Sequence, residues 1–149
     1  MTGIVAGVDG SSHSRDALEW AINESAIRQV PPTVLTVSPV ASSIFGPGFA
    51  PLRFPADEET RVQAEKATQQ VVDDVLARRG DASGLPVTVR VISGIPADEL
   101  IMASQGTDLL VVGTRGAGGF AKLVMGSVSS QVVQHSLCPV VVVPAAQRG

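Results

Sequence analysis

Five short apolar runs, separated by longer segments with a helical pattern, constrain the fold of this chain more than any other feature. Such runs have little polar alternation, which is typical of parallel strands covered on both faces. We expect strands at residues 4–8, 33–37, 87–92, 109–112 and 140–143. In the third run, Thr88 and Arg90 alternate with apolar residues, so we expect that strand at an exposed edge of the sheet.

The segments between these runs repeat their apolar residues at helical spacing. We expect helices at about residues 13–29, 57–79, 96–106 and 127–136. In the first helix, Trp20 and Ile27 share one face, which we expect to pack in the core. Strands alternate with helices, and no Asn-Gly or Asp-Gly turn joins two strands. The sequence therefore predicts a Rossmann-like α/β fold: an open, mostly parallel five-stranded sheet with helices on both faces.

A length of 149 residues fits a single domain, with residues 40–55 as an irregular loop within it. This segment has neither a helical nor a strand period, and it holds three of the four phenylalanines, Phe45, Phe49 and Phe54. Two interpretations of these aromatic residues stay open. They either pin the loop onto the body of the domain or form a lid or partner surface.

Composition excludes several functional classes. A net charge of −3 and an aromatic content of 3% argue against nucleic acid as a partner. The longest apolar runs have only the length of a strand, which argues against a membrane span. The single Cys138 cannot form an internal disulfide, and residues 1–3 lead into the first apolar run without a charged leader. We therefore expect a cytoplasmic protein.

The glycine-rich stretch after the fourth apolar run indicates an anion site. In an open parallel sheet, ligands bind at the carboxyl ends of strands, and Asp9 and Gly113 follow two such ends. Glycines at 113, 116, 118, 119 and 126 let backbone N–H groups turn toward a ligand, and Ser127 lies where a helix would begin. The sequence therefore predicts a phosphate cradle. Arg115 and Lys122 are either phosphate contacts or solvated loop charges.

Two common phosphate motifs do not fit this stretch. A dinucleotide fingerprint would begin directly after a strand and would need an acid about 20 residues later, and neither condition holds. A P-loop would place a glycine at Ala121 and a hydroxyl at Leu123. His13 and His135 have no acid or cysteine neighbours at ligand spacing, so we do not expect a histidine metal site.

The spacing that does fit is Gly113, two residues, Gly116, nine residues, and Gly126-Ser127. Together with V-D-G-S at 8–11, D-L-L-V-V-G-T-R-G at 108–116 and C-P-V-V-V-V-P at 138–144, it makes the chain resemble the universal stress protein family along essentially its whole length. The resemblance implies the adenine nucleotide alpha-hydrolase-like fold. It also implies ATP as the ligand, with Mg²⁺ or Mn²⁺ on its phosphates.

The resemblance further implies roles for single residues. Asp9 matches the family's acid near the nucleoside and the metal, and Val37 matches the residue whose backbone meets the adenine. The ribose and phosphate contacts match Gly113, Gly116, Gly126, Ser127, Val128 and Ser129. The chemistry suits this set, because N–H groups at a helix start and two serine hydroxyls can hold a triphosphate.

The last apolar run indicates a homodimer. Residues 140–143 are four valines, and at a sheet edge they would present unpaired backbone groups to a second copy of the chain. The family resemblance implies such a dimer as well.

The function we expect is that of an ATP-binding regulatory sensor or switch in the stress response, without efficient catalysis. No general base other than Asp9 is evident near the proposed phosphates, so any hydrolysis should be slow. Three alternatives stay open: a slow ATPase or nucleotidyl-transfer enzyme at the same site, an AMP or cyclic AMP binder, and a nucleotide-free dimerising scaffold.

Overall fold

The computed structural model describes residues 3–9, 12–39, 41–43, 52–54, 57–80, 85–114 and 126–144. In chain order, its elements are β1 (Ile4–Val8), α1 (Ser12–Arg28), β2 (Pro32–Pro39), β3 (Ala41–Ser43), β4 (Leu52–Phe54), α2 (Glu58–Arg79), β5 (Thr88–Gly94), α3 (Pro96–Ser104), β6 (Leu109–Gly113), α4 (Ser127–His135) and β7 (Val140–Val143).

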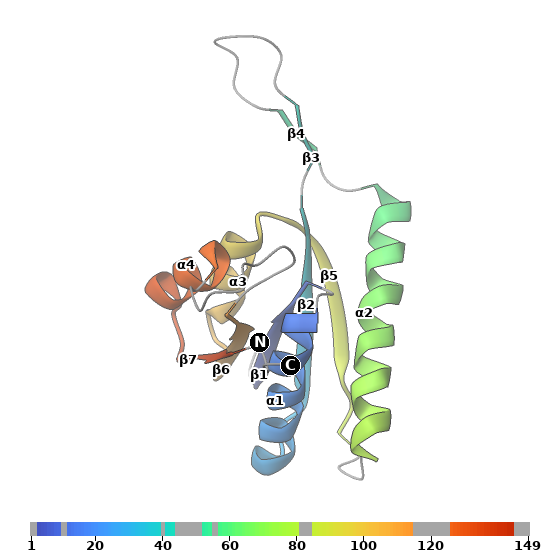
Figure 1. The fold of residues 1–149 in the computed structure, drawn as a ribbon. Coiled ribbons are helices and arrows are strands. Elements are labelled where there is room, and N and C mark those ends of the chain that lie inside the picture. Colours follow the sequence, from blue (N-terminus) through green and yellow to red (C-terminus); the bar gives the residue numbers. More distant parts are fainter. Residues whose placement is uncertain are drawn as a thin grey trace.

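Five parallel strands form one open sheet in the order β5-β2-β1-β6-β7 (Figure 1). They correspond to the five apolar runs, and α1 to α4 correspond to the four expected helices. The predicted α/β fold class is confirmed. β5 lies at one edge of the sheet, as its polar alternation predicts, and β7 lies at the other.

Helices α1 and α2 cover one face of the sheet, and α3 and α4 cover the other (Figure 1). On one face, a buried cluster joins the strands to Leu18 of α1 and Val72 of α2. On the other face, a second cluster joins them to Leu100 of α3 and Val132 of α4. Because β1 and β6 lie in the middle and are covered on both sides, they are apolar at nearly every position.

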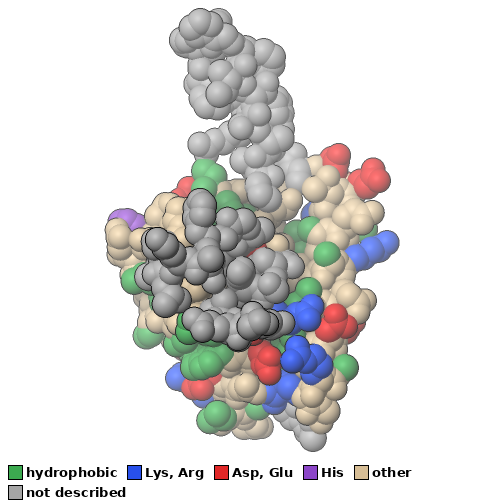
Figure 2. Space-filling model, viewed as in Figure 1, with side chains coloured by type: hydrophobic (Ala, Val, Ile, Leu, Met, Phe, Trp, Pro, Cys, Tyr) green, Lys and Arg blue, Asp and Glu red, His purple; other side chains and the backbone are tan. Residues whose placement is uncertain are grey.

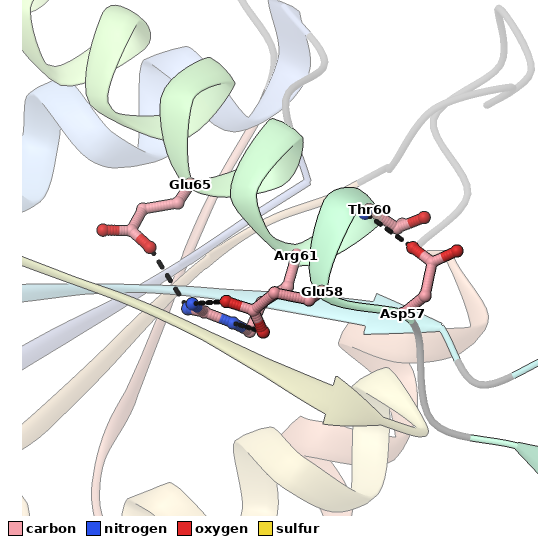
Figure 3. A network of polar contacts seen from close by, with 5 residues as sticks. All are labelled: Asp57, Glu58, Thr60, Arg61 and Glu65. Atoms are coloured by element: carbon pink, nitrogen blue, oxygen red, sulfur yellow. Dashed lines mark hydrogen bonds and ion pairs between the residues drawn. The ribbon is translucent and has the colours of Figure 1, made fainter.

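The first turns of α2 are held by local polar contacts (Figure 3). Asp57 caps the helix by accepting a hydrogen bond from the backbone N–H of Thr60 at 2.7 Å, and Arg61 pairs with Glu58 at 2.6 Å and with Glu65 at 3.2 Å. Hydrogen bonding by the Thr60 side chain, and then by its backbone, lowers the pKa of Asp57 from its ordinary value of 3.8. A hydrogen bond and charge attraction from Arg61 likewise lower the pKa of Glu58.

The expectation that Ile27 packs in the core is wrong, since 76% of its surface is exposed. The buried stripe of α1 includes Leu18 and Ile22, and Ile27 lies nine residues from Leu18, which is about half a turn away around the helix. Trp20 lies on the same side of α1 as Ile27, but it packs against the buried cluster and is partly buried there.

The expectation that residues 40–55 are irregular throughout is also wrong. β3 and β4 form a short antiparallel ladder within this segment, with Ser42 opposite Arg53. Figure 1 shows the ladder standing apart from the sheet, beyond the end of β2. Three-residue strands are too short for a periodic pattern, so the sequence carries no signal for them. The residues between the two strands lie outside the described part of the chain.

The surface of α2 carries acidic and basic side chains that are interspersed rather than sorted by sign (Figure 2). Within the described ranges, no helix is both long and apolar enough to cross a bilayer.

Candidate functional site

The sheet order places its switch point between β1 and β6. From β1 the chain crosses through α1 to β2 on one side, and from β6 it crosses through α4 to β7 on the other side. Adjacent parallel strands with opposite crossovers leave a crevice at their carboxyl ends, which is where open α/β sheets bind ligands. Asp9 and Gly113 lie at these two ends.

Three residues form a row at this edge of the sheet. When the registers of β1 with β2 and with β6 are continued to the residue after β1, Asp9 comes level with Val37 on one side and with Thr114 on the other. Asp9 is exposed. Val37 is half-buried against the apolar cluster on the α3 and α4 face of the sheet.

The end of β6 and the start of α4 are joined by hydrogen bonds. The backbone N–H of Gly126 donates to the carbonyl of Thr114 at 2.6 Å, and the backbone N–H of Thr114 donates to the carbonyl of Val143 at 3.1 Å. The hydroxyl of Ser129 donates to the carbonyl of Gly113. Thr114 and Gly126, 12 positions apart in the sequence, are thereby in direct contact, and Thr114 is also bonded to β7.

The N-terminus of α4 presents backbone donors at this edge. Gly126 is the N-cap, in an extended conformation, and no side chain of the described residues caps the helix. The first hydrogen bond inside the helix runs from the N–H of Ser130 to the carbonyl of Gly126 at 2.9 Å. The N–H groups of residues 127–129 therefore have no hydrogen-bond acceptor within the helix. Such groups carry the partial positive charge of the helix dipole, which favours an anion.

The predicted site residues of α4 have different surroundings. Ser127 is exposed, Val128 is half-buried and packs against the cluster on this face, and Ser129 is buried. Gly116, which the family resemblance places in the site, lies outside the described residues, as do Arg115 and Lys122.

Thr114 is a residue of this region that the sequence did not single out. It contributes its backbone N–H to β7 and its backbone carbonyl to the N-cap of α4. Because these groups occur in almost every residue, no side-chain pattern could have revealed the role.

The described part of the chain holds no group of three or more His, Cys, Asp or Glu side chains that could bind a metal ion. Asp9 is the one acid of the row, and its carboxylate is an oxygen ligand of the kind that Mg²⁺ or Mn²⁺ binds. The edge thus combines backbone donors, which suit an anion, with one carboxylate, which suits a cation.

The family model described as "Universal stress protein family" matches residues 1–144. The chain belongs to the universal stress protein family. This confirms the resemblance found in the sequence.

Two relatives show how this universal stress protein compares in length. It is 36% identical over 143 residues to a universal stress protein of Mycolicibacterium smegmatis, in an alignment that covers 95% of this chain and 47% of that protein. It is 30% identical over 146 residues to universal stress protein YxiE of Bacillus subtilis, covering 94% of this chain and 97% of YxiE. The chain thus spans about half the length of the mycobacterial relative and nearly all of YxiE.

Solved universal stress proteins share the fold. UspA from Lactobacillus plantarum has a TM-score of 0.70 at 23% identity, covering 95% of this chain and 97% of that one. A universal stress protein in complex with cAMP has a TM-score of 0.67 at 23% identity, covering 97% and 98%. The Archaeoglobus fulgidus protein in complex with dAMP has a TM-score of 0.66 at 21% identity, covering 95% and 97%.

Proposed function

We propose that this universal stress protein binds ATP, with Mg²⁺ or Mn²⁺ on the phosphates, at the carboxyl edge between β1 and β6, and that it acts as a regulatory sensor or switch. One observation carries the proposal. The N-terminus of α4, with a glycine as its N-cap, is bonded to Thr114 at the end of β6, at the switch point of the sheet and beside Asp9 in the row.

Each part of the nucleotide has a counterpart at this edge. The phosphates face the backbone N–H groups of Ser127, Val128 and Ser129. These groups have no hydrogen-bond acceptor within the helix. Val37 follows the last residue pair of the β1–β2 ladder and offers its backbone to the adenine. Asp9 lies between these two regions, next to the nucleoside and the cation. Gly113, Gly116 and Gly126 complete the ribose and phosphate contacts.

A nucleoside monophosphate is the second candidate ligand. The solved relatives with cAMP and dAMP support it, because each of these ligands carries a single phosphate. A helix N-terminus binds phosphate without counting phosphate groups, so α4 suits both ligand classes. The effect of Mg²⁺ on affinity distinguishes the two ligand classes, since a triphosphate chelates Mg²⁺ far better than a monophosphate does. ATP binding should therefore strengthen with Mg²⁺, whereas cAMP binding should not.

The regulatory role rests on the chemistry of the row. Asp9 is its one acid, and efficient phosphoryl transfer also needs groups that position the attacking water and stabilise the transferring phosphate. We expect hydrolysis to be slow. Single-turnover measurements on the wild type and on Asp9→Asn separate a switch from an enzyme. A loss of several orders of magnitude in rate on substitution would favour the slow ATPase.

The same protein is proposed to form a homodimer through β7. This strand pairs with β6 on one side, no other strand of the described residues pairs with it, and its four valines are half-buried. Light scattering should give about twice the chain mass of 15.3 kDa. Val142→Pro should give monomer or aggregate: the carbonyls of Pro139 and Val143 face β6, so the N–H of Val142, an odd number of residues from both, faces the open edge, where proline removes this donor. A stable wild-type monomer would contradict the dimer.

The test of nucleotide binding begins with the small molecules released when the purified protein is denatured, identified by chromatography and mass spectrometry. Calorimetric titrations with ATP, AMP and cAMP follow, with and without Mg²⁺. Ser127→Ala should weaken ATP binding about 3- to 10-fold, as expected for the loss of one hydrogen bond. Ser130→Ala, in the next turn, is the matched control. The proposal fails when the wild type neither releases nor binds an adenine nucleotide.

A further inference from the structure

The hydroxyl of Ser129 faces the protein interior. The side chain is 5% exposed, and its Oγ donates to the carbonyl of Gly113, the last residue of β6. A serine hydroxyl has one proton and therefore one hydrogen bond to donate. Phosphate oxygens only accept hydrogen bonds, so this hydroxyl cannot donate to a phosphate while it donates to Gly113.

We infer that Ser129 is a positioning residue, whose hydroxyl fastens the first turn of α4 to the end of β6 while its backbone N–H remains available to the phosphate. This inference rests on the proposed nucleotide-binding function. It reassigns one of the two hydroxyls that the family resemblance places on the ligand. The exposed Ser127 supplies the hydroxyl for the ligand, and the buried Ser129 sets the direction of the helix.

Two hydrogen bonds then hold the N-terminus of α4 against residues 113 and 114. The bond from the N–H of Gly126 to the carbonyl of Thr114 fixes the N-cap, and the bond from the Ser129 hydroxyl fixes the third helical residue. With both ends of the first turn attached to β6, its N–H groups keep one orientation before any ligand arrives. A preorganised site binds more tightly, because the ligand does not have to order the donors.

Hydrogen exchange of the ligand-free protein tests the inference directly. Ser129→Ala should lower the protection factors of the Gly126 and Ser130 backbone N–H groups about 5- to 10-fold, as expected for the loss of one buried hydrogen bond. Ser129→Thr keeps the donor and should restore most of the protection. Ser130→Ala, one residue further along α4, is the matched control and should leave the Gly126 group unchanged.

Binding measurements complete the test. Ser129→Ala should weaken ATP about 5- to 10-fold and leave adenosine, which has no phosphate, within twofold of the wild type. Circular dichroism establishes that each variant is folded. Loss of ATP affinity with unchanged protection factors would mean that the hydroxyl contacts the ligand, and it would overturn the inference. Unchanged values in both assays would overturn it too. A wild type that binds no adenine nucleotide overturns the proposed function itself, which separates the two failures.

Discussion

A pair of buried threonines between β2 and α2 permits a sharp prediction about stability. Thr36 and Thr68 are 8% and 3% exposed, and their hydroxyl oxygens lie 2.8 Å apart. The Thr68 hydroxyl also donates to the carbonyl of Ala64 at 2.8 Å. Because this bond uses the only proton of Thr68, the bond between the two hydroxyls must be donated by Thr36.

Because the hydrogen bonds run in this direction, the two valine substitutions should lower the free energy of unfolding by different amounts. Thr68→Val removes the acceptor and leaves the buried Thr36 hydroxyl without its partner, which should cost about 1–3 kcal/mol. Thr36→Val leaves Thr68 bonded to Ala64 and should cost only about 0.5–1.5 kcal/mol. In the double variant neither hydroxyl remains, so its cost should be at least about 1 kcal/mol smaller than the sum of the two single costs.

Urea denaturation of the four proteins, at a fixed protein concentration, measures these free energies of unfolding. Valine has nearly the shape of threonine, so cavity formation contributes little to the comparison. Equal costs for the two single variants would contradict the assigned donor. Strictly additive costs in the double variant would contradict the hydrogen bond itself.

Three further predictions concern stability. Gly7→Ala should destabilise the fold by about 1–3 kcal/mol, because its Cβ would lie 2.8 Å from Cδ2 of Leu100, and Leu100→Ala should relieve part of that cost; chemical denaturation measures both. Ser25→Ala should raise the free energy of unfolding by about 0.5–2 kcal/mol, since the 1%-exposed Ser25 hydroxyl has no hydrogen-bond partner among the described residues; a lower value would contradict this reasoning. The lowered pKa of Asp57 means that its stabilising contribution is complete above the unfolded pKa near 3.8 and is lost as the pH falls through the folded value. Asp57→Asn should therefore flatten the fall of Tm below about pH 4, with unchanged curves as the contrary result.

The elements of the main sheet and its helices were predictable because each repeats one simple pattern over many residues. Runs such as β6 have no polar residue to place them on a surface, which points to burial on both faces. Helix ends were visible where a residue has a special conformation. Gly80 ends α2 with a φ of +57°, a left-handed value that glycine adopts without steric cost.

The features that the sequence did not reveal depend on contacts with residues that are distant in the sequence. Ile27 has a helical spacing from Trp20, but only the packed structure tells which face of α1 meets the sheet. β3 and β4 are defined by pairing with each other, at a length where no periodicity exists. Thr114 joins β7 to α4 through its backbone alone. In the candidate site, the contact between the Ser129 hydroxyl and the carbonyl of Gly113 is likewise visible only in the packed structure.

Helix geometry explains why the two serines at the start of α4 have different surroundings. Ser127 and Ser129 are two positions apart, so their side chains leave the helix about 200° from each other. When Ser129 points inward to the carbonyl of Gly113, Ser127 has to point outward, and their burial agrees with this. In this chain the Ser129 hydroxyl is bonded to Gly113, and Ser127 is the exposed serine of the pair. The backbone N–H groups, which all point along the helix axis, are the donors that both residues can offer at once.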